Sequence, residues 1–290
     1  MITTNDRSTN PDTIVLIHGL WMTPRSWEGW VERYERRGYR VLTPAYPGLQ
    51  VEVAALRADP SPIEALTVPA VLERLEEVIR GLDRPPIIMG HSFGGLFTQL
   101  LLDRGFGAAG VAIDSVPPEG IKVTPLAQVR ASFPVLHNPA NRHRAVPLTP
   151  EQFHYAFANT VGAEESATVY ERYAVAAPGR FIWDGALANF TPGHQDTYVN
   201  FKNEGRAPLL LIAGGDDHLV PASVTRSNAE HYRDSKAITA FKEFPGRSHY
   251  ILGQDGWEEV ADVALAWALN PVAVVKGVEP VPATVAPPAR

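Results

Sequence analysis

The sequence contains no cysteine, which excludes disulfide bonds, a thiol nucleophile and cysteine-ligated metal. It has no block dense in Lys and Arg and carries a net charge of −6, which argues against a nucleic-acid partner. No apolar run approaches the roughly 20 residues that span a bilayer, and the polar first 13 residues lack the apolar core of a signal peptide. We therefore expect a cytoplasmic chain with no membrane partner; none of these features predicts its oligomeric state.

What the sequence does contain is an alternation of apolar runs with amphipathic segments. The run at 13–19 ends in glycine and suits a strand buried on both faces, whereas 68–82 repeats apolar residues at helical spacing. Strands alternating with helices predict an α/β fold with a doubly wound, mostly parallel sheet. The predicted strands are 13–19, 39–48, 85–90, 108–115, 207–215 and 237–244, and the predicted helices are 26–38, 68–82, 93–105, 221–233 and 256–268.

The alternation breaks in the middle of the chain, after the strand that ends near Asp114. The broken stretch is rich in proline, histidine and aromatic residues, with helical patterns only at 150–160 and 163–174. A mainly helical insertion between the fourth and fifth parallel strands accounts for this break. The predicted division is a core of 13–115 and 207–268, a helical cap of 116–206, and an extended or mobile tail of 270–290.

The stretch "GHSFGG" places Ser92 two residues from a glycine on either side, in the pattern G-x-S-x-G. Such a serine sits on a tight strand-to-helix turn, where neighbouring backbone leaves no room for a Cβ atom. The pattern alone is weak, but here an apolar strand precedes it and an apolar helix follows. We interpret Ser92 as a nucleophile rather than a loop serine. A phosphate-binding loop is disfavoured because the Lys-Ser/Thr pair is missing.

A serine nucleophile needs a base and an acid. His249 follows the last predicted strand, at the sheet edge where ligand-facing loops gather, and is the best candidate base. The stretch "AGGDDHLVP" supplies two carboxylates, Asp216 and Asp217, after the preceding strand. The chain order is therefore nucleophile, acid, base, with the choice of carboxylate open.

Over residues 13–268 the sequence resembles the α/β-hydrolase superfamily. The motifs are "HGLW" at an oxyanion stretch, "GHSFGG" at a nucleophile elbow, "GGDDHLVP" at an acid loop and "GRSHY" at a terminal histidine. This resemblance implies Asp217 as the acid, with Asp216 as a competitor. Asp114 is a second competitor, because some relatives draw their acid from the strand before the cap. It also implies backbone oxyanion donors at Leu20 and Phe93.

Two features depart from this resemblance. Many relatives carry Asp-x-Pro-Gly after the second strand, where this chain has Ala45 and Tyr46 before Pro-Gly. Relatives often begin with an antiparallel hairpin, and only a dozen residues precede the first predicted strand here. We expect that edge of the sheet to be reduced or missing, with no effect on the catalytic residues.

The aromatic residues of the cap, taken as a group, favour a small-molecule substrate with an apolar portion. The alternative for each of them is packing in the cap's own core, and the alternative for Trp21 is packing in the core. The residues assigned to the substrate pocket are Trp21, His91, Phe153, Phe157 and Trp183. No cofactor is expected, and no metal, because no H-x-x-x-H or H-E-x-x-H spacing occurs.

The leading functional hypothesis is a serine hydrolase that cleaves a carboxylic ester, or a related acyl bond such as a lactone, through an acyl-enzyme. Haloalkane dehalogenase and epoxide hydrolase activities are disfavoured because they need aspartate where Ser92 stands. Cofactor-free perhydrolase or haloperoxidase-like activity, carbon–carbon bond hydrolysis and lyase chemistry can use the same three residues and stay open. A non-catalytic ligand-binding protein of the same fold is the alternative outside enzymes.

Overall fold

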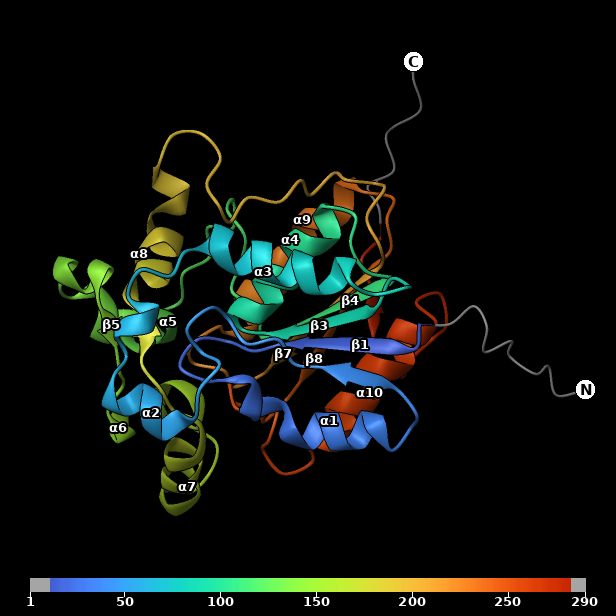
Figure 1. The fold of residues 1–290 in the computed structure, drawn as a ribbon. Coiled ribbons are helices and arrows are strands. Elements are labelled where there is room, and N and C mark those ends of the chain that lie inside the picture. The colour runs from blue at the N-terminus through green and yellow to red at the C-terminus, as the bar shows by residue number, and fades with distance from the viewer. Residues whose placement is uncertain (1–10, 283–290) are drawn as a thin grey trace, which may run out of the picture.

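The computed structural model describes residues 11–282, and within them a seven-stranded sheet forms the centre (Figure 1). The strand order is β2-β1-β3-β4-β7-β8-β9. All neighbouring pairs are parallel except β8 and β9. The strands are β1 Thr13–Ile17, β2 Arg40–Leu42, β3 Ile87–His91, β4 Ala109–Ile113, β7 Leu209–Gly214, β8 Thr239–Phe244 and β9 Glu279–Pro280.

Helices cover both faces of this sheet, which explains why the central strands are apolar throughout. Every residue of β1, β3, β4 and β7 is buried. Helices α1 and α10 cover one face, and α3, α4 and α9 cover the other (Figure 1). Their bounds are α1 Glu28–Glu35, α3 Val68–Arg80, α4 Phe93–Asp103, α9 Ala222–His231 and α10 Trp257–Leu269.

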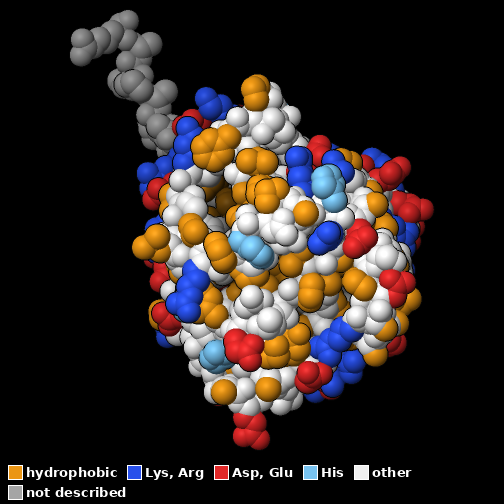
Figure 2. Space-filling model, turned by 90° about the vertical axis from the view of Figure 1, so that its left-hand side faces the viewer, with side chains coloured by type: hydrophobic (Ala, Val, Ile, Leu, Met, Phe, Trp, Pro, Cys, Tyr) orange, Lys and Arg blue, Asp and Glu red, His pale blue; other side chains and the backbone are white. Residues whose placement is uncertain are grey.

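The helical part of the segment between β4 and β7 packs beyond the carboxyl ends of the strands, at the left of Figure 1, and its last residues return along the core, where Asn200 and Asn203 bond to Asp103 at the end of α4. It contains α5 Leu126–Leu136, α6 Pro150–Phe157, α7 Ala163–Tyr173, α8 Gly179–Leu187 and a small antiparallel pair of β5 Ala145–Val146 with β6 Ala177–Pro178. Helix α2, Val53–Ala58, joins it, because Arg57 donates to the carbonyl oxygens of Tyr170 and Ala174. Figure 2 shows this face of the molecule, with hydrophobic side chains gathered around a hollow.

The predicted α/β class and doubly wound sheet are confirmed by this strand order. Three helices were not predicted: α2, α5 and α8. Helix α5 contains Pro134 and turns apolar residues outward, so its sequence lacks the usual helical pattern. The second strand is shorter than predicted, ending before Pro44. No helix in the described range is long and apolar enough to cross a bilayer.

One edge of the sheet differs from the prediction made for the tail. Beyond the last helix, Glu279 and Pro280 form β9 and pair with Phe241 and Ala240 of β8, so part of the predicted tail is an edge strand. Residues 283–290 of the predicted tail lie outside the described residues. At the other edge the sheet ends with β2, and residues 1–10 are likewise outside the described range.

Candidate active site

Ser92 lies at the junction of β3 and α4 in a backbone conformation that non-glycine residues rarely adopt. Its φ and ψ angles are 57° and −120°. The strained turn is held by neighbouring strands and helix: the Ser92 amide donates to the Ile113 carbonyl over 2.9 Å, and the Ser92 carbonyl accepts from Gly95 and Val116. The sequence forms the turn because flanking positions are glycine.

Gly90 and Gly94 are required because neighbouring backbone leaves no room for a Cβ atom, and not because of their φ angles. A Cβ atom at Gly90 would overlap the carbonyl oxygen of Gly94, and one at Gly94 would overlap the carbonyl oxygen of Ile17. The turn therefore packs backbone against backbone on both sides of Ser92. This is the close approach that the G-x-S-x-G pattern predicts.

His249 and Asp217, the predicted base and acid, form a fully buried hydrogen-bonded pair. Nδ1 of His249 donates to Oδ2 of Asp217 over 2.6 Å. The other oxygen of Asp217 accepts from the amides of Leu219 and Val220 at 2.7 and 2.8 Å. These bonds fix the carboxylate, which fixes the imidazole tautomer. Nε2 of His249 is buried without a hydrogen-bond partner in the described chain, so it can take a proton.

Neither competing carboxylate accepts from Nδ1 of His249. Asp216 is exposed, although its carbonyl oxygen accepts from the side chain of Asn159. Asp114 is fully buried with a φ of 43°, and its Oδ1 accepts from the Gly214 amide over 2.6 Å. Burial, and next the negative charge of Asp217, raise the pKa of the Asp114 carboxyl well above its ordinary value. Asp114 is thereby held toward its neutral form.

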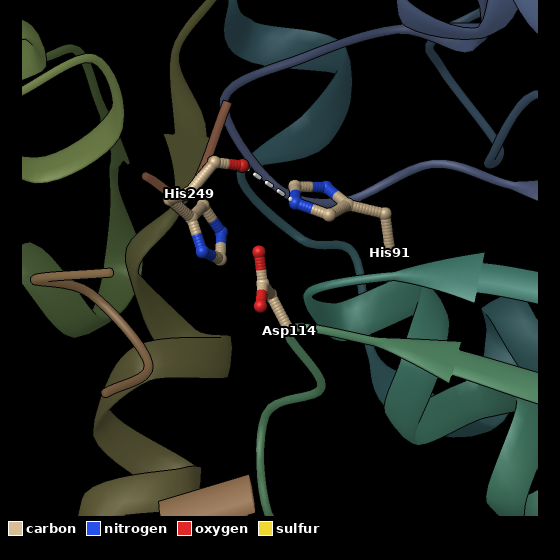
Figure 3. A group of neighbouring side chains, drawn as sticks. All are labelled: His91, Asp114 and His249. Atoms are coloured by element: carbon tan, nitrogen blue, oxygen red, sulfur yellow. Dashed lines mark hydrogen bonds between the residues drawn. The ribbon is translucent and has the colours of Figure 1, made fainter. Parts of the chain in front are cut away.

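His91, predicted in the substrate pocket, instead supports the loop that carries His249. Its Nε2 donates to the His249 carbonyl oxygen over 2.9 Å, and the two rings lie 4.5 Å apart (Figure 3). Burial lowers the pKa of His91 well below its ordinary value, and the nearby His249 lowers it further. His91 is next to Ser92 in the chain, so its hydrogen bond ties the turn at Ser92 to the loop that carries His249. Because His91 is neutral, it adds no charge there.

Figure 3 shows His91, Asp114 and His249 converging, with ligand-type atoms within 4.8 Å of one another. His91 already donates from Nε2 to a carbonyl, and His249 from Nδ1 to Asp217. Ligands of tetrahedral zinc lie about 3.4 Å apart, from bond lengths near 2.0–2.1 Å. Each of the three residues also keeps one buried polar atom without a hydrogen-bond partner among residues 11–282: Nδ1 of His91, Nε2 of His249 and Oδ2 of Asp114.

The predicted oxyanion stretch packs directly on the elbow. A Cβ atom at Gly19 would lie 2.7 Å from the Cβ of Ser92, which places the backbone before Leu20 beside the serine. The Phe93 amide is among the first four of α4, which have no acceptor within their own helix. Both predicted donors are thus carried by backbone next to Ser92.

Tyr46 supports this stretch, a role that sequence reasoning missed. Its hydroxyl donates to the carbonyl oxygen of His18, and the two rings stack 3.9 Å apart. Burial lowers the pKa of His18 to about 4, so the stack is between neutral rings. The only signal in the sequence was the departure from Asp-x-Pro-Gly at this turn.

The segment between β4 and β7 bonds to each loop of the site. The Tyr250 amide, next to His249, donates to the Phe157 carbonyl over 2.8 Å. Nε1 of Trp21 donates to the Val146 carbonyl over 3.0 Å, and the Trp21 carbonyl accepts from Val175. Trp21 has a φ of 60°, a strained conformation that these bonds hold. The covering segment and the site therefore form one packed unit.

A cavity of about 270 Å³ lies between this segment and the core. Its lining is mainly apolar and includes Trp21 and Phe153. Phe157 stacks on Phe153 at 4.8 Å and contacts the His249 ring edge-on at 4.8 Å. The ring of Phe157 thus lies between His249 and Phe153, which lines the cavity. Trp183, also predicted in the pocket, is half-buried in α8 and is not part of this lining.

The doubly wound sheet and the residues at its strand ends define a class of α/β enzymes. The chain belongs to the alpha/beta hydrolase family, whose model matches residues 14–263. It is also 24% identical over 242 residues to a 2-hydroxy-6-oxononadienedioate/2-hydroxy-6-oxononatrienedioate hydrolase of Burkholderia vietnamiensis, with 76% of each chain covered. The protein is therefore an enzyme of the hydrolase class.

Solved structures show the same fold at low identity. An extracellular alpha/beta-hydrolase from a Paenibacillus species superposes with a TM-score of 0.64 at 18% identity, covering 90% of this chain and all of that one. A pyrethroid hydrolase from Sphingobium faniae gives a TM-score of 0.60 at 18% identity, covering 89% and 98%. A monoacylglycerol lipase of Paleococcus ferrophilus gives 0.61 at 18% identity, covering 90% and 95%. These likenesses establish the fold alone.

Proposed function

We propose that this enzyme is a serine hydrolase that cleaves a carboxylic ester, or a related acyl bond such as a lactone, in a small molecule. Ser92 is the nucleophile, His249 the base and Asp217 the acid. The single observation that carries this proposal is the buried pair in which His249 donates from Nδ1 to Asp217 over 2.6 Å, leaving Nε2 unpartnered. That arrangement is what a serine hydroxyl requires of its base.

The proposed reaction has two halves. Nε2 of His249 takes the hydroxyl proton as Ser92 attacks the carbonyl carbon, and the resulting imidazolium is stabilised by Asp217. His249 then gives that proton to the departing alcohol, which leaves an acyl-enzyme. In the second half His249 activates water, the acid is released and Ser92 regains its proton.

The backbone amides of Leu20 and Phe93 are the proposed donors to the tetrahedral oxyanion. Their support comes from the packing of Gly19 against Ser92 and from the position of Phe93 at the start of α4. Removing one donor of this kind costs about 10²–10³ in rate. Because the donors here are backbone groups, side-chain substitution at these two positions tests packing rather than the donors themselves.

In this proposal residues 116–206 act as a cap on a core of 13–115 and 207–268, and the cavity accepts the apolar part of the substrate. A cavity of roughly 150 Å³ is enough for benzene, so about 270 Å³ suits a medium-length acyl chain or a substituted ring. Arg57 is the one charged residue in its lining, and its guanidinium pairs with Glu171. This composition favours an uncharged apolar group over a dicarboxylate such as the one in the Burkholderia relative's name.

The proposal is tested by turnover of p-nitrophenyl butyrate. Ser92→Ala lowers kcat by at least about 10³-fold and abolishes labelling by a fluorophosphonate probe. The matched control is Ser223→Ala, an exposed serine of α9, which keeps full activity. Undiminished turnover by purified Ser92→Ala would overturn the assignment. Labelling without multiple turnovers on any ester or lactone would favour a binding protein, and turnover only with peroxide would favour the perhydrolase alternative.

A further inference from the structure

Helix α5 presents an apolar stripe to solvent. Leu126, Val129 and Phe133 recur at helical spacing on one face and are 87%, 46% and 61% exposed. Arg130 and His137 extend the same face, and the His137 ring stacks on Phe133. We call these five residues the α5 stripe. Such a face is unusual in a surface helix, which normally turns its apolar side inward.

The inward side of α5 makes the inversion clearer. Ala131 and Val135 are buried there, but they are smaller than the residues left outside. Gln128 and Ser132, which are polar, are only partly exposed. Packing within this chain therefore does not account for where the largest apolar residues of α5 point.

Further apolar residues lie beside the stripe. Asn189 accepts from the Gly120 amide and donates to the Ile121 carbonyl, which ties the end of α8 to the segment before α5. Both tied segments expose large apolar side chains. These are Val123 at 38%, Leu187 at 38% and Phe190 at 83% exposure. Helices α5 and α8 lie on the face turned toward the viewer in Figure 2, where hydrophobic side chains gather.

The segment that carries the α5 stripe is basic, although Glu119 and Glu151 stand just outside its two ends and Asp184 lies in α8. Residues 121–150 contain four Lys or Arg residues and no Asp or Glu, although the chain has a net charge of −6. Arg142 pairs with Asp184. Lys122 and Arg144 are exposed and make no ion pair within residues 11–282. The apolar side chains are thus accompanied by two exposed cations, Lys122 and Arg144, that make no ion pair within residues 11–282.

Apolar side chains next to cations favour one of two candidate partners for this surface, a second copy of the chain or a lipid membrane. A symmetric dimer through the α5 stripe would bring Arg130 and Lys122 of two copies toward one another, which opposes association. An anionic lipid surface instead receives the apolar side chains at its acyl boundary and attracts the cations at its headgroups. Charge complementarity therefore favours lipid over a second copy.

We propose that the α5 stripe and its cationic surroundings dock this enzyme on anionic lipid surfaces. The sequence predicts no membrane partner because it lacks a long apolar run. That argument excludes a helix that spans the bilayer, but it does not exclude a helix that lies on the bilayer surface. Docking goes beyond the proposed reaction and does not depend on which bond Ser92 attacks. Because α5 packs on α6, whose Phe157 contacts His249, the docked surface would face the side from which the site is covered.

Co-sedimentation of the full chain with vesicles tests this directly. Wild type binds vesicles of phosphatidylcholine with phosphatidylglycerol, and binding falls as salt rises. It binds phosphatidylcholine alone at least about tenfold more weakly. Leu126→Ser with Phe133→Ser lowers affinity for the anionic vesicles at least about tenfold. Lys122→Gln with Arg144→Gln lowers it roughly fivefold per charge.

The matched control is Val272→Ser with Val274→Ser, two exposed valines after α10 at the opposite side of the fold. This pair leaves vesicle binding unchanged, and all variants keep the wild-type melting midpoint and soluble-ester turnover. Absence of binding by wild type overturns the proposal, as does equal binding by the Leu126/Phe133 variant. The proposal is also overturned if light scattering shows a wild-type dimer and the Leu126/Phe133 variant is a monomer. That result would assign the α5 stripe to contact with a second copy.

Discussion

The imidazole of His249 donates from Nδ1 to Oδ2 of Asp217 over 2.6 Å, and neither side chain has any solvent exposure. Two backbone amides hold the other carboxylate oxygen, so the proposed acid is fixed before any substrate binds. This preorganisation separates Asp217 from the exposed carboxylate next to it in the chain.

Replacing Asp217 with Asn is expected to lower kcat by about 10⁴-fold, because the amide favours the wrong imidazole tautomer. The matched substitution Asp216→Asn changes a solvent-exposed side chain and leaves kcat within about twofold. Steady-state kinetics on a p-nitrophenyl ester measure both. Similar losses in the two variants would contradict the assignment of the acid.

Asp114→Asn is expected to change the pH dependence of stability. The folded state raises the pKa of Asp114 well above its ordinary value of 3.8, so it retains a proton that the unfolded chain releases. Stability contributed by that proton is complete below pH 3.8 and falls as the pH rises toward the raised value. The neutral amide lacks this loss. Its stability relative to wild type therefore increases with pH above about 4.

Urea unfolding midpoints of wild type and Asp114→Asn, measured from pH 4 to pH 8, give the check. Titration of His18 and His91 is common to both proteins and cancels to first order in the difference. A difference that stays constant or shrinks with rising pH would show that Asp114 is ionised in the folded protein.

Alanine at Gly90 or Gly94 is expected to prevent formation of the elbow, because each new Cβ would overlap a backbone carbonyl oxygen. Ester turnover and the melting midpoint should both fall sharply. Gly185 in α8 is the matched control: a Cβ there meets nothing within 4 Å, so Gly185→Ala should stabilise the protein by about 0.5–1 kcal/mol. Wild-type activity in Gly94→Ala would refute this account of the turn.

Ala176→Phe is expected to fill part of the cavity and to change chain-length preference. Ala176 lines the cavity and is 7% exposed, so a phenyl group there takes the volume available to an acyl chain. The ratio of kcat/KM for octanoate to that for acetate esters should fall at least about tenfold. Ala140→Phe, at an exposed position outside the cavity, should leave the ratio unchanged. An unaltered ratio in Ala176→Phe would place the acyl group elsewhere.

Much of the core could be predicted because its signals are local. The strands are continuous apolar runs, and the pattern that predicts the turn at Ser92 lies within residues 90–94. The meeting of strand ends at one edge of a parallel sheet predicts a carboxylate near His249, and the choice of Asp217 over Asp216 comes from the resemblance of the acid loop. Helix α5 escapes prediction because an amphipathic helix is recognised by an apolar face turned inward, and α5 reverses that pattern.

The contacts that shape the site were less accessible. His91 binds a carbonyl 158 residues away and Trp21 one 125 residues away. Nothing local in the sequence encodes such partners. His91 is predicted in the substrate pocket, yet its Nε2 donates to the backbone carbonyl of His249. Tyr46 was noted only as a departure from a motif, and its bond to His18 depends on how β2 ends.

Ser92 is 2% exposed and His249 has no exposed surface, so the conformation described is one that no substrate can enter. With Ser92 and His249 in the proposed roles, a substrate reaches them only in a conformer that opens this site. If that conformer is a small fraction of molecules, the apparent affinity for every substrate is reduced by the same fraction. Substrates are then selected first by whether they fit through the opening of the site. An ester attached to a polymer or a folded protein is excluded by its size, however reactive its carbonyl group.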